Sequence, residues 1–330
     1  MSSFTIYHED FKAILGHSPK LDVLLENKEY PFAHEAGVFI PSENSLFITS
    51  NQYVDPLSPP TKKIQISKVT LPGNDPIRCE EVFPESVPMA NGGVNYKNGI
   101  LFCAQGDMKA PSGLAFMETQ PPYRSSFLLT SFYGRPFNSL NDVVVHSDGS
   151  VWFTDPMYGS EQGIRPPATS PNQVYRWDVE NGGSIRAVAD GFGRCNGICF
   201  SPDEKIVYVT DTDYIHGDGT TDGVRASSIY AFDIVHYSGQ PFLTNRRLFA
   251  FADKWVPDGI KCDTNGNVYS GCGDGVNVWS PGGILLGRIL VEGGAANFCF
   301  GRNGELFILN EHKLWRAQLG SHIRGDLLKI

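Results

Sequence analysis

Six oxygen-bearing side chains occupy one position in six similar segments of the chain, and their types are those that bind a hard cation. These residues are Glu35, Asn91, Asn141, Asn196, Asp258 and Asn297. Asn and Asp often bond nearby backbone groups in turns, but a turn preference would also place Gly, Ser or Pro at this position. Carboxylate and amide oxygens suit Ca²⁺, whereas His and Cys, which zinc prefers, are missing from the set. We therefore expect one divalent metal ion, Ca²⁺ before Mg²⁺, Mn²⁺ or Zn²⁺.

An ion held by two carboxylates retains little net charge, so it can serve as a Lewis acid toward a neutral polar substrate. Asp258 is the second carboxylate of the set, and we expect it to act also as the base that activates a water molecule. Two of the amides, and three side chains in adjoining or overhanging loops, are expected to contact the substrate. They are Asn91, Asn297, His34, His216 and Tyr158.

The six segments share a pattern that predicts the elements carrying these side chains. Each begins with the polar residue and, in most copies, a small residue, then continues as an apolar strand, turns at Pro, Asp, Asn or Gly, and ends in a second strand. One example is Asn196-Gly-Ile-Cys-Phe-Ser-Pro-Asp-Glu-Lys-Ile-Val-Tyr. Each segment therefore reads as a β-hairpin. Further strands follow within each unit of roughly fifty residues, such as Gln173-Val-Tyr-Arg-Trp-Asp.

About four strands per unit, without helical periodicity of useful length, predict an all-β fold: a six-bladed β-propeller with about four antiparallel strands per blade. We expect residues 1–330 to form one domain, because every blade is needed to close the ring. A pair of β-sandwiches is the alternative, but six similar units do not divide naturally into two such cores. Since the innermost strands of a propeller line its central channel, the six polar residues should converge there.

Composition and charge argue against several classes of protein. Hydrophobic residues make up 41% of the 330 residues, enough to form a core and to exclude a disordered chain. The net charge of −9 disfavours nucleic acid and anionic membranes as partners. No apolar run is long enough to span a bilayer, and residues 1–16 lack the pattern of a signal peptide, so we expect a cytoplasmic protein. The seven cysteines, mostly in hydrophobic runs, are expected to be buried free thiols.

Several stretches resemble the family of senescence marker protein 30, gluconolactonases and luciferin-regenerating enzymes, close to its fungal and bacterial gluconolactonase-like members. They include Phe137-Asn-Ser-Leu-Asn-Asp-Val-Val-Val, Trp152-Phe-Thr-Asp-Pro-Met-Tyr-Gly, Pro257-Asp-Gly-Ile-Lys-Cys-Asp and Ala296-Asn-Phe-Cys-Phe-Gly-Arg-Asn-Gly-Glu-Leu-Phe. The resemblance runs from about Glu35 to Leu319 and implies a six-bladed propeller with a divalent metal in its channel. On the matching positions, the implied ligands are Glu35, Asn141, Asn196 and Asp258.

Members of that family hydrolyse lactones, so the resemblance implies a metal-dependent lactone hydrolase. One departure bears on the substrate, because the sugar-lactone branch has an arginine where this chain has Ser139. The resemblance therefore supports ester or lactone hydrolysis better than it supports a sugar acid substrate. Aromatic and apolar loop residues point toward a hydrophobic or aromatic lactone; they are Tyr53, Met108, Tyr158 and Tyr214.

Two alternatives use the same ring of residues. In one, the propeller binds Ca²⁺ only for stability and its upper face is a platform for interactions with other molecules. In the other, the same metal hydrolyses phosphotriesters, as related propellers do. The sequence leaves open which small-molecule lactone is the substrate, which metal is physiological, and the oligomeric state.

Overall fold

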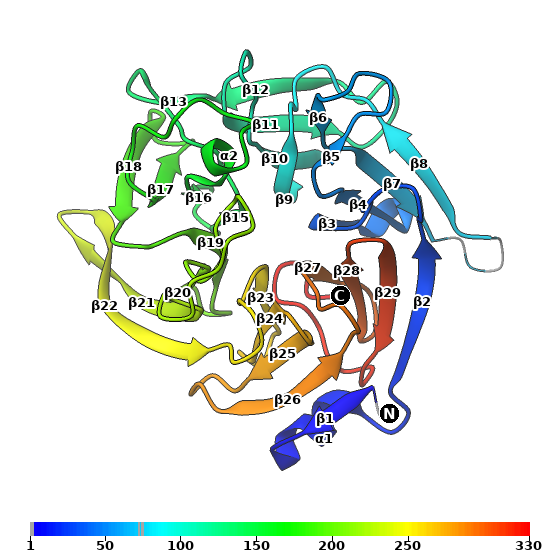
Figure 1. The fold of residues 1–330 in the computed structure, drawn as a ribbon. Coiled ribbons are helices and arrows are strands. Elements are labelled where there is room, and N and C mark those ends of the chain that lie inside the picture. Colours follow the sequence, from blue (N-terminus) through cyan, green and yellow to red (C-terminus); the bar gives the residue numbers. More distant parts are fainter. Residues whose placement is uncertain (1–2, 72, 74–75) are drawn as a thin grey trace.

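Six antiparallel sheets surround a central axis in the computed structural model, so the predicted six-bladed β-propeller is confirmed (Figure 1). The structure describes residues 3–71, 73 and 76–330. One strand of each sheet lies innermost. These six strands are β3 (Glu35–Ile40), β9 (Ala90–Tyr96), β15 (Val143–Val145), β19 (Cys195–Phe200), β23 (Ile260–Cys262) and β27 (Asn297–Phe300).

Three further strands follow outward in each blade, paired antiparallel in chain order for five of the six blades. Blades 1 to 3 contain β4 (Ser45–Thr49), β7 (Ile66–Thr70) and β8 (Arg78–Val82); β10 (Gly99–Ala104), β11 (Gly113–Glu118) and β12 (Ser125–Leu129); and β16 (Val151–Asp155), β17 (Gln173–Asp178) and β18 (Ser184–Ala189). Blades 4 to 6 contain β20 (Ile206–Asp211), β21 (Ser228–Tyr237) and β22 (Gln240–Phe251); β24 (Val268–Cys272), β25 (Gly275–Trp279) and β26 (Leu285–Leu290); and β28 (Glu305–Asn310) and β29 (Lys313–Gln318).

The ring is closed by a strand from the beginning of the chain. Strand β2 (Lys20–Glu26) pairs with β29 and forms the outermost strand of blade 6, with Lys20 opposite Gln318. Strand β1 (Phe4–Ile6) likewise adds a fifth strand to blade 5 by pairing with β26. Blades 5 and 6 are therefore each joined to the N-terminal part of the chain by backbone hydrogen bonds, which ties the two halves of the sequence together.

The core lies between neighbouring blades, and this placement explains the apolar runs of the sequence. Every residue of β4, β10 and β16 is buried, because each sheet packs against another sheet on both faces. The ring of Phe39 in blade 1 stacks on Phe307 in blade 6, with centroids 5.9 Å apart. Trp152 of blade 3 meets Phe200 of blade 4 edge-on at 5.5 Å. Aromatic pairs of this kind join adjacent blades and hold the inner strands around the channel.

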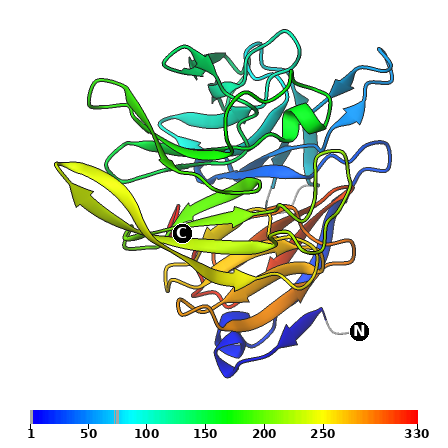
Figure 2. The ribbon, with the colours of Figure 1, turned by 60° about the vertical axis from the view of Figure 1, so that its left-hand side comes forward.

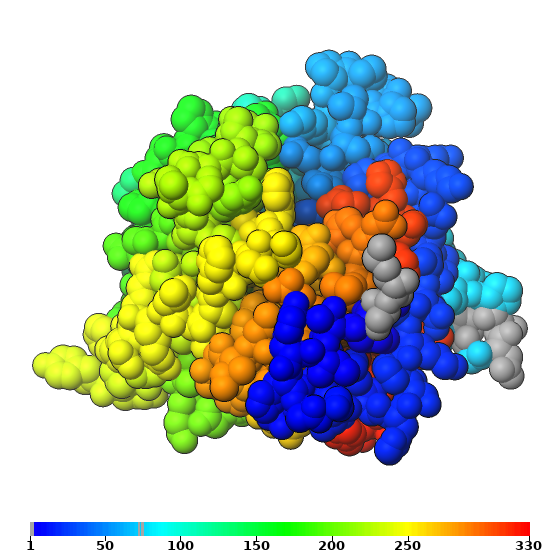
Figure 3. Space-filling view, turned by 60° about the horizontal axis from the view of Figure 1, so that its bottom comes forward, coloured from blue at the N-terminus to red at the C-terminus, as the bar shows by residue number. Residues whose placement is uncertain are grey.

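Several short elements lie outside the six blade sheets. They are the helices α1 (Glu9–Leu15) and α2 (Tyr158–Glu161), a 3-10 turn at Pro41–Glu43, and the two-residue strands β5 (Tyr53–Val54), β6 (Lys62–Lys63), β13 (Ser131–Phe132) and β14 (Arg135–Pro136). The long hairpin β21–β22 of blade 4 projects beyond the other blades (Figures 2 and 3). Helix α2 lies in the connection between β16 and β17, close to the channel mouth in Figure 1.

The prediction of buried free thiols is confirmed for six of the seven cysteines and is wrong for Cys79, which lies on the outermost strand of blade 1. All seven are free thiols; six are buried, and Cys79 is exposed. Within the described ranges, no helix combines the length and apolar character that a bilayer-spanning segment requires.

Candidate functional site

Five of the six ring residues converge on one pocket of about 100 Å³ at one end of the central channel. They lie within the first two residues of the inner strands of blades 1, 2 and 4 or two residues before those of blades 3 and 5, so the propeller brings residues from across the chain to one place. We call this cavity the ring pocket. It is lined by His34, Glu35, Asn51, Gln52, Ile64, Asn91, Gln105, Asn141, Tyr158, Gln162, Asn196 and Asp258.

Glycines after the ring residues allow the inner strands to approach one another. A Cβ atom on Gly92 would lie 2.5 Å from the carbonyl oxygen of Asn141, in the next blade. A Cβ on Gly197 would lie 2.5 Å from the carbonyl oxygen of Asp258. Side chains at these positions would push the blades apart. The Asn-Gly and Asp-Gly pairs of the repeat therefore reflect close packing around the channel.

Hydroxyl groups on the second strands fix three of the ring residues, Asn91, Asn196 and Asp258, to the neighbouring blade. Thr49 donates a hydrogen bond to the carbonyl oxygen of Asn91 at 3.2 Å, and Thr154 donates to that of Asn196 at 2.6 Å. Thr210 accepts a hydrogen bond from the N–H of Gly197 at 2.7 Å and donates to the carbonyl oxygen of Asp258 at 3.0 Å. These contacts set the height of the ring residues along the channel.

Replacing Thr210 with Val should lower the free energy of unfolding by about 1–3 kcal/mol, because the isosteric methyl leaves a buried N–H and a buried C=O without their partner. A Thr210→Ser variant keeps the hydroxyl and serves as the matched control. Urea unfolding of both variants measures the difference. Equal stability of Thr210→Val and wild type, or equal losses in both variants, would contradict the role given to this hydroxyl.

Asn297, the sixth ring residue, is absent from the lining of the ring pocket. Its side-chain Nδ2 donates to Glu35 Oε2 at 2.6 Å, and its Oδ1 accepts from the N–H of Phe298 at 2.8 Å. Gly259 makes room for this arrangement, since a Cβ there would lie 2.4 Å from the Asn297 amide carbon. Asn297 therefore orients the Glu35 carboxylate, a different place from the substrate contact expected from the sequence.

The ring contains buried oxygens without a hydrogen-bond donor. Within the described part of the chain, Asn141 Oδ1, Asp258 Oδ1 and Gln52 Oε1 are shielded from solvent and accept no hydrogen bond. All three belong to residues of the ring pocket. Buried acceptors are almost always satisfied in folded proteins, so oxygens left over in one pocket are suited to a bound cation. The donor set of carboxylate and amide oxygens fits a divalent ion of the calcium type.

The electrostatics of the two ring carboxylates, Glu35 and Asp258, also favour a bound divalent cation. Burial raises the pKa of Glu35, and the nearby Asp258 carboxylate raises it further. Burial also raises the pKa of Asp258, although the positive charge of His34 opposes the change. A divalent cation between these groups would stabilise both ionised forms. Across the described residues, no cluster of three or more His, Cys, Asp or Glu side chains is arranged to hold a metal, so ring amides would have to complete the ligand set.

A chain of hydrogen bonds fixes His34 at the edge of the ring pocket. Its Nδ1 lies 2.6 Å from Glu311 Oε1, and the Asn51 amide donates to both oxygens of that carboxylate at 3.2–3.3 Å. Burial alone would lower the pKa of His34, but the carboxylate of Glu311, helped by Glu35 and Asp258, raises it to about 10. Glu311 therefore occupies Nδ1 of His34, a residue that lines the ring pocket.

Tyr158 lies in the lining of the ring pocket, whereas His216 lies outside it. Tyr158 lines the ring pocket with its ring, while its hydroxyl group bonds Thr212. His216 does not line the pocket; its Nδ1 lies 3.2 Å from the hydroxyl of Thr220 in the same loop. That loop packs on α2, since a Cβ on Gly217 would lie 2.9 Å from the Tyr158 carbonyl oxygen. A direct contact of His216 with a molecule in the ring pocket is not favoured by this placement.

The pocket lining is more polar than the loop aromatics suggest. Of the four loop residues singled out in the sequence, Tyr158 lines the pocket, whereas Tyr53 stacks on Tyr30 at 4.6 Å and Tyr214 contacts Trp255 edge-on at 5.4 Å. The fourth, Met108, is 61% exposed. Instead of further aromatic residues, side chains with amide groups line the ring pocket. These amide residues are Asn51, Gln52, Gln105 and Gln162.

Ser139 does not line the ring pocket, but it holds two segments next to the pocket by hydrogen bonds. Its hydroxyl donates to Gln105 Oε1 at 3.3 Å and accepts from the N–H of Gly159 in α2 at 3.1 Å. Asp155, the last residue of β16, accepts hydrogen bonds from the N–H groups of Asn138 and Ser139 at 3.0 and 2.8 Å. Asp211, at the end of β20, holds the segment before β19 in the same way. Ser139, Asp155, Asp211 and Glu311 were not identified from the sequence as residues that hold the site in place. The signal that could have found Asp155 and Asp211 is the acidic residue at the end of the second strand of a blade.

Comparison with known proteins agrees with this geometry. The family model described as SMP-30/Gluconolactonase/LRE-like region matches residues 26–312. Lactonohydrolase oryL of Aspergillus oryzae is 29% identical over 332 aligned residues, which cover 94% of this chain and 72% of that protein. The gluconolactonase of Zymomonas mobilis is 31% identical over 223 residues, covering 62% of this chain and 57% of the relative. A solved gluconolactonase structure from Xanthomonas campestris has a TM-score of 0.74 and 26% identity, over 97% of this chain and 95% of that one.

The match to the family model extends over blades 1 to 6, from the last residue of β2 to beyond β28. It therefore includes all of the ring residues and the segments that support them. The chain belongs to the SMP-30/gluconolactonase/LRE-like family.

Proposed function

We propose that the protein is a lactone hydrolase that depends on a divalent metal ion bound in the ring pocket. The observation that carries this proposal is a pair of buried oxygens, Asn141 Oδ1 and Asp258 Oδ1, which accept no hydrogen bond from the described residues. The names of the relatives, lactonohydrolase and gluconolactonase, support a lactone as substrate. The residues that would hold the ion are Glu35, Asn141, Asn196 and Asp258.

Bound in this pocket, a divalent ion would polarise the lactone carbonyl and stabilise the negative charge that forms on its oxygen when water attacks. Asp258 supplies the base. Its Oδ1 belongs to a residue of the ring pocket and accepts no hydrogen bond from the described residues, whereas the Glu35 carboxylate is held by Asn297, so Asp258 is the carboxylate better placed to take a proton from water in the pocket. Asn297 keeps the Glu35 carboxylate turned toward the pocket through its 2.6 Å hydrogen bond.

His34 offers a hydrogen-bond donor to the substrate. Because Glu311 occupies its Nδ1, Nε2 is the nitrogen that can donate a hydrogen bond to a lactone oxygen. The amides of Asn91, Gln52 and Gln105 offer donors and acceptors around the same space. Such a lining favours a lactone that carries polar substituents over a purely apolar one. The pocket volume of about 100 Å³ favours a small ring.

Removal of the metal with a chelator is expected to abolish hydrolysis of every lactone that the enzyme accepts and to lower its Tm, because the two buried carboxylates then lose the divalent cation that stabilises their ionised forms. Adding Ca²⁺ back should restore both. Turnover on sugar, aliphatic and aryl lactones and on one phosphotriester, measured beside the Tm, separates the candidates. Full activity after complete chelation contradicts metal dependence; a Tm shift in a protein that hydrolyses none of the lactones contradicts the enzyme and favours a binding platform.

A further inference from the structure

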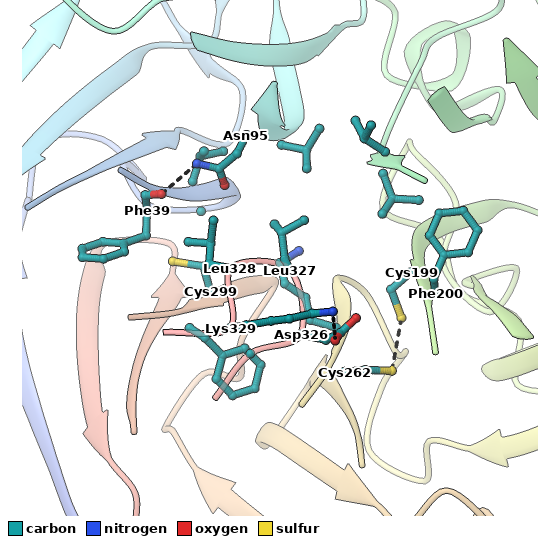
Figure 4. A pocket seen from close by; sticks show the side chains of 18 of the residues that line it. Phe39, Asn95, Cys199, Phe200, Cys262, Cys299, Asp326, Leu327, Leu328 and Lys329 are labelled. Atoms are coloured by element: carbon teal, nitrogen blue, oxygen red, sulfur yellow. Dashed lines mark hydrogen bonds and ion pairs between the residues drawn. The ribbon is translucent and has the colours of Figure 1, made fainter. Parts of the chain in front are cut away.

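A second and larger cavity lies at the other end of the channel from the ring pocket. Its volume is about 290 Å³, close to the lower limit of the roughly 300–1,000 Å³ typical of sites for small organic ligands. We call it the lower cavity. Its lining residues come after the ring residues on the six inner strands, as with Asn95 on β9 and Cys299 on β27, and the strands carry them away from the ring (Figure 4).

Residues 325–330 close one side of the lower cavity. Gly325 forms a β-bridge with Asp263, and the N–H of Asp326 donates to the carbonyl oxygen of Cys262 at 3.0 Å. Leu328 and Ile330 pack against the hydrophobic cluster between blades 6 and 1. Figure 4 shows Leu327 and Leu328 beside Cys299 in the cavity wall. The segment is therefore anchored in place.

Apolar side chains form a large part of the lining of the lower cavity, beside the polar residues Asn95, His146, Ser147, Glu204, Lys261, Asp326 and Lys329. Valines and isoleucines of the inner strands form its sides, and leucines of residues 325–330 form its floor. Among the lining side chains are Val94, Val144, Ile198, Ile260, Leu327 and Leu328. An apolar hollow of this kind favours an apolar part of a ligand, because burying that part removes its surface from water.

One cation in this apolar surrounding has no ion-pair partner. Lys261, on β23, lines the cavity, and its Nζ lies 6.0 Å from the centre of the Phe298 ring. No carboxylate of the described residues lies within 4.0 Å of that nitrogen, whereas Lys329 in the same cavity is paired with Asp326 at 3.4 Å. The charge of Lys261 does favour ionised Asp142, but that carboxylate already accepts hydrogen bonds from two backbone N–H groups, of Val143 and Ile198.

The other charged groups that line the cavity have partners of their own. Glu204 accepts hydrogen bonds from the N–H and the hydroxyl group of Ser147, and it also lies 3.5 Å from His146. The ammonium group of Lys261 is left to attract a single negative charge, and the valines and leucines around it favour an apolar chain next to that charge. We propose that the lower cavity binds an apolar monocarboxylate, with the carboxylate on Lys261 and the hydrocarbon chain against the apolar walls. This site is separate from the ring pocket, so the proposal does not depend on lactone hydrolysis.

Calorimetric titration of the protein with decanoate tests the proposal, with 1-decanol as the uncharged probe of the same chain length. Decanoate is expected to bind saturably and more tightly than 1-decanol. A Lys261→Met variant should weaken decanoate binding on the order of tenfold or more and leave 1-decanol binding unchanged, while Lys261→Arg should retain most of the affinity. Absence of saturable decanoate binding, or equal affinity in wild type and Lys261→Met, overturns the proposal.

A second pair of variants tests the same site if Lys261→Met does not fold. Leu327 is 47% exposed, so a polar substitution there is tolerated. Leu327→Glu should repel decanoate and weaken its binding, whereas Leu327→Gln, which has the same shape without the charge, should weaken it much less. Both should hydrolyse lactones at the wild-type rate.

Two further measurements locate the carboxylate. Because a carboxylate could also bind a metal in the ring pocket, the titrations are repeated after chelation, and decanoate is tested as an inhibitor of lactone hydrolysis. Binding that persists without metal and does not compete with the lactone supports the lower cavity. Binding that disappears on chelation and competes with the lactone places decanoate in the ring pocket and overturns the proposal.

Discussion

An Asp258→Asn variant is expected to lose on the order of 10²–10⁴-fold in turnover at saturating metal, the range typical of a lost general base. Asn keeps the size of the side chain and one oxygen ligand, but it cannot take a proton from water. The fold should survive, because burial already disfavours the charge on Asp258 and the variant removes that charge. The test measures kcat over a series of Ca²⁺ concentrations, so that weaker metal binding is separated from the loss of the base.

Asn91→Ala is the matched control for this experiment. Asn91 lines the same pocket, but its removal takes away no charge and no base. We expect it to retain the metal and to raise KM more than it lowers kcat. Should Asp258→Asn keep near-normal turnover once metal is replenished, the role given to Asp258 is wrong.

Replacing Glu35 with Gln should weaken Ca²⁺ binding on the order of 100-fold and leave most of the turnover recoverable at saturating Ca²⁺. Glu35 is only 3% exposed and its carboxylate is bonded to Asn297, so its contribution is negative charge for a cation and not proton transfer. A calcium titration followed by both binding and turnover gives the two quantities. Asp258→Asn and Glu35→Gln should therefore differ in whether excess metal rescues the rate.

An Asn297→Ala variant serves as the control for Glu35→Gln. It removes the hydrogen bond that orients Glu35 and keeps the carboxylate itself, so the loss of Ca²⁺ affinity should be smaller, on the order of tenfold. Normal Ca²⁺ affinity in Glu35→Gln would contradict the assignment of Glu35 as a ligand. A rate in Glu35→Gln that no concentration of Ca²⁺ restores would show that Glu35 acts in the reaction itself.

The repeat pattern predicts the six blades and the convergence of all six ring residues, of which five line the ring pocket and Asn297 does not. Both follow from symmetry: when similar units are stacked around an axis, equivalent positions of the inner strands come to the same height in the channel. The Asn-Gly and Asp-Gly pairs also indicate how closely the blades pack, because the residue after the ring residue must leave room for the next blade. Buried free thiols are predicted for all seven cysteines for a related reason, since hydrophobic runs lie between blades, and six of them are buried.

Contacts between side chains of different blades are not predicted by the repeat. His34 and Glu311 are separated by 277 residues and form a 2.6 Å contact because blade 6 closes against blade 1. Asn297 has the same residue type as three other ring residues, yet it turns toward Glu35 instead of the pocket. Such choices depend on which neighbour a side chain reaches from its own strand, and equivalent positions in a repeat have different neighbours.

The sequence by itself determined the number of blades, the residues around the channel mouth and the oxygen-rich chemistry expected there, since each of these depends on residue type at a repeated position. The tertiary structure decided how the ring is closed, because the seven residues of β2 carry no copy of the repeat and find their place only by pairing with β29. It also decided which loop residues reach the ring pocket and that Lys261 has no carboxylate partner among the described residues, because both depend on distances between segments far apart in the chain.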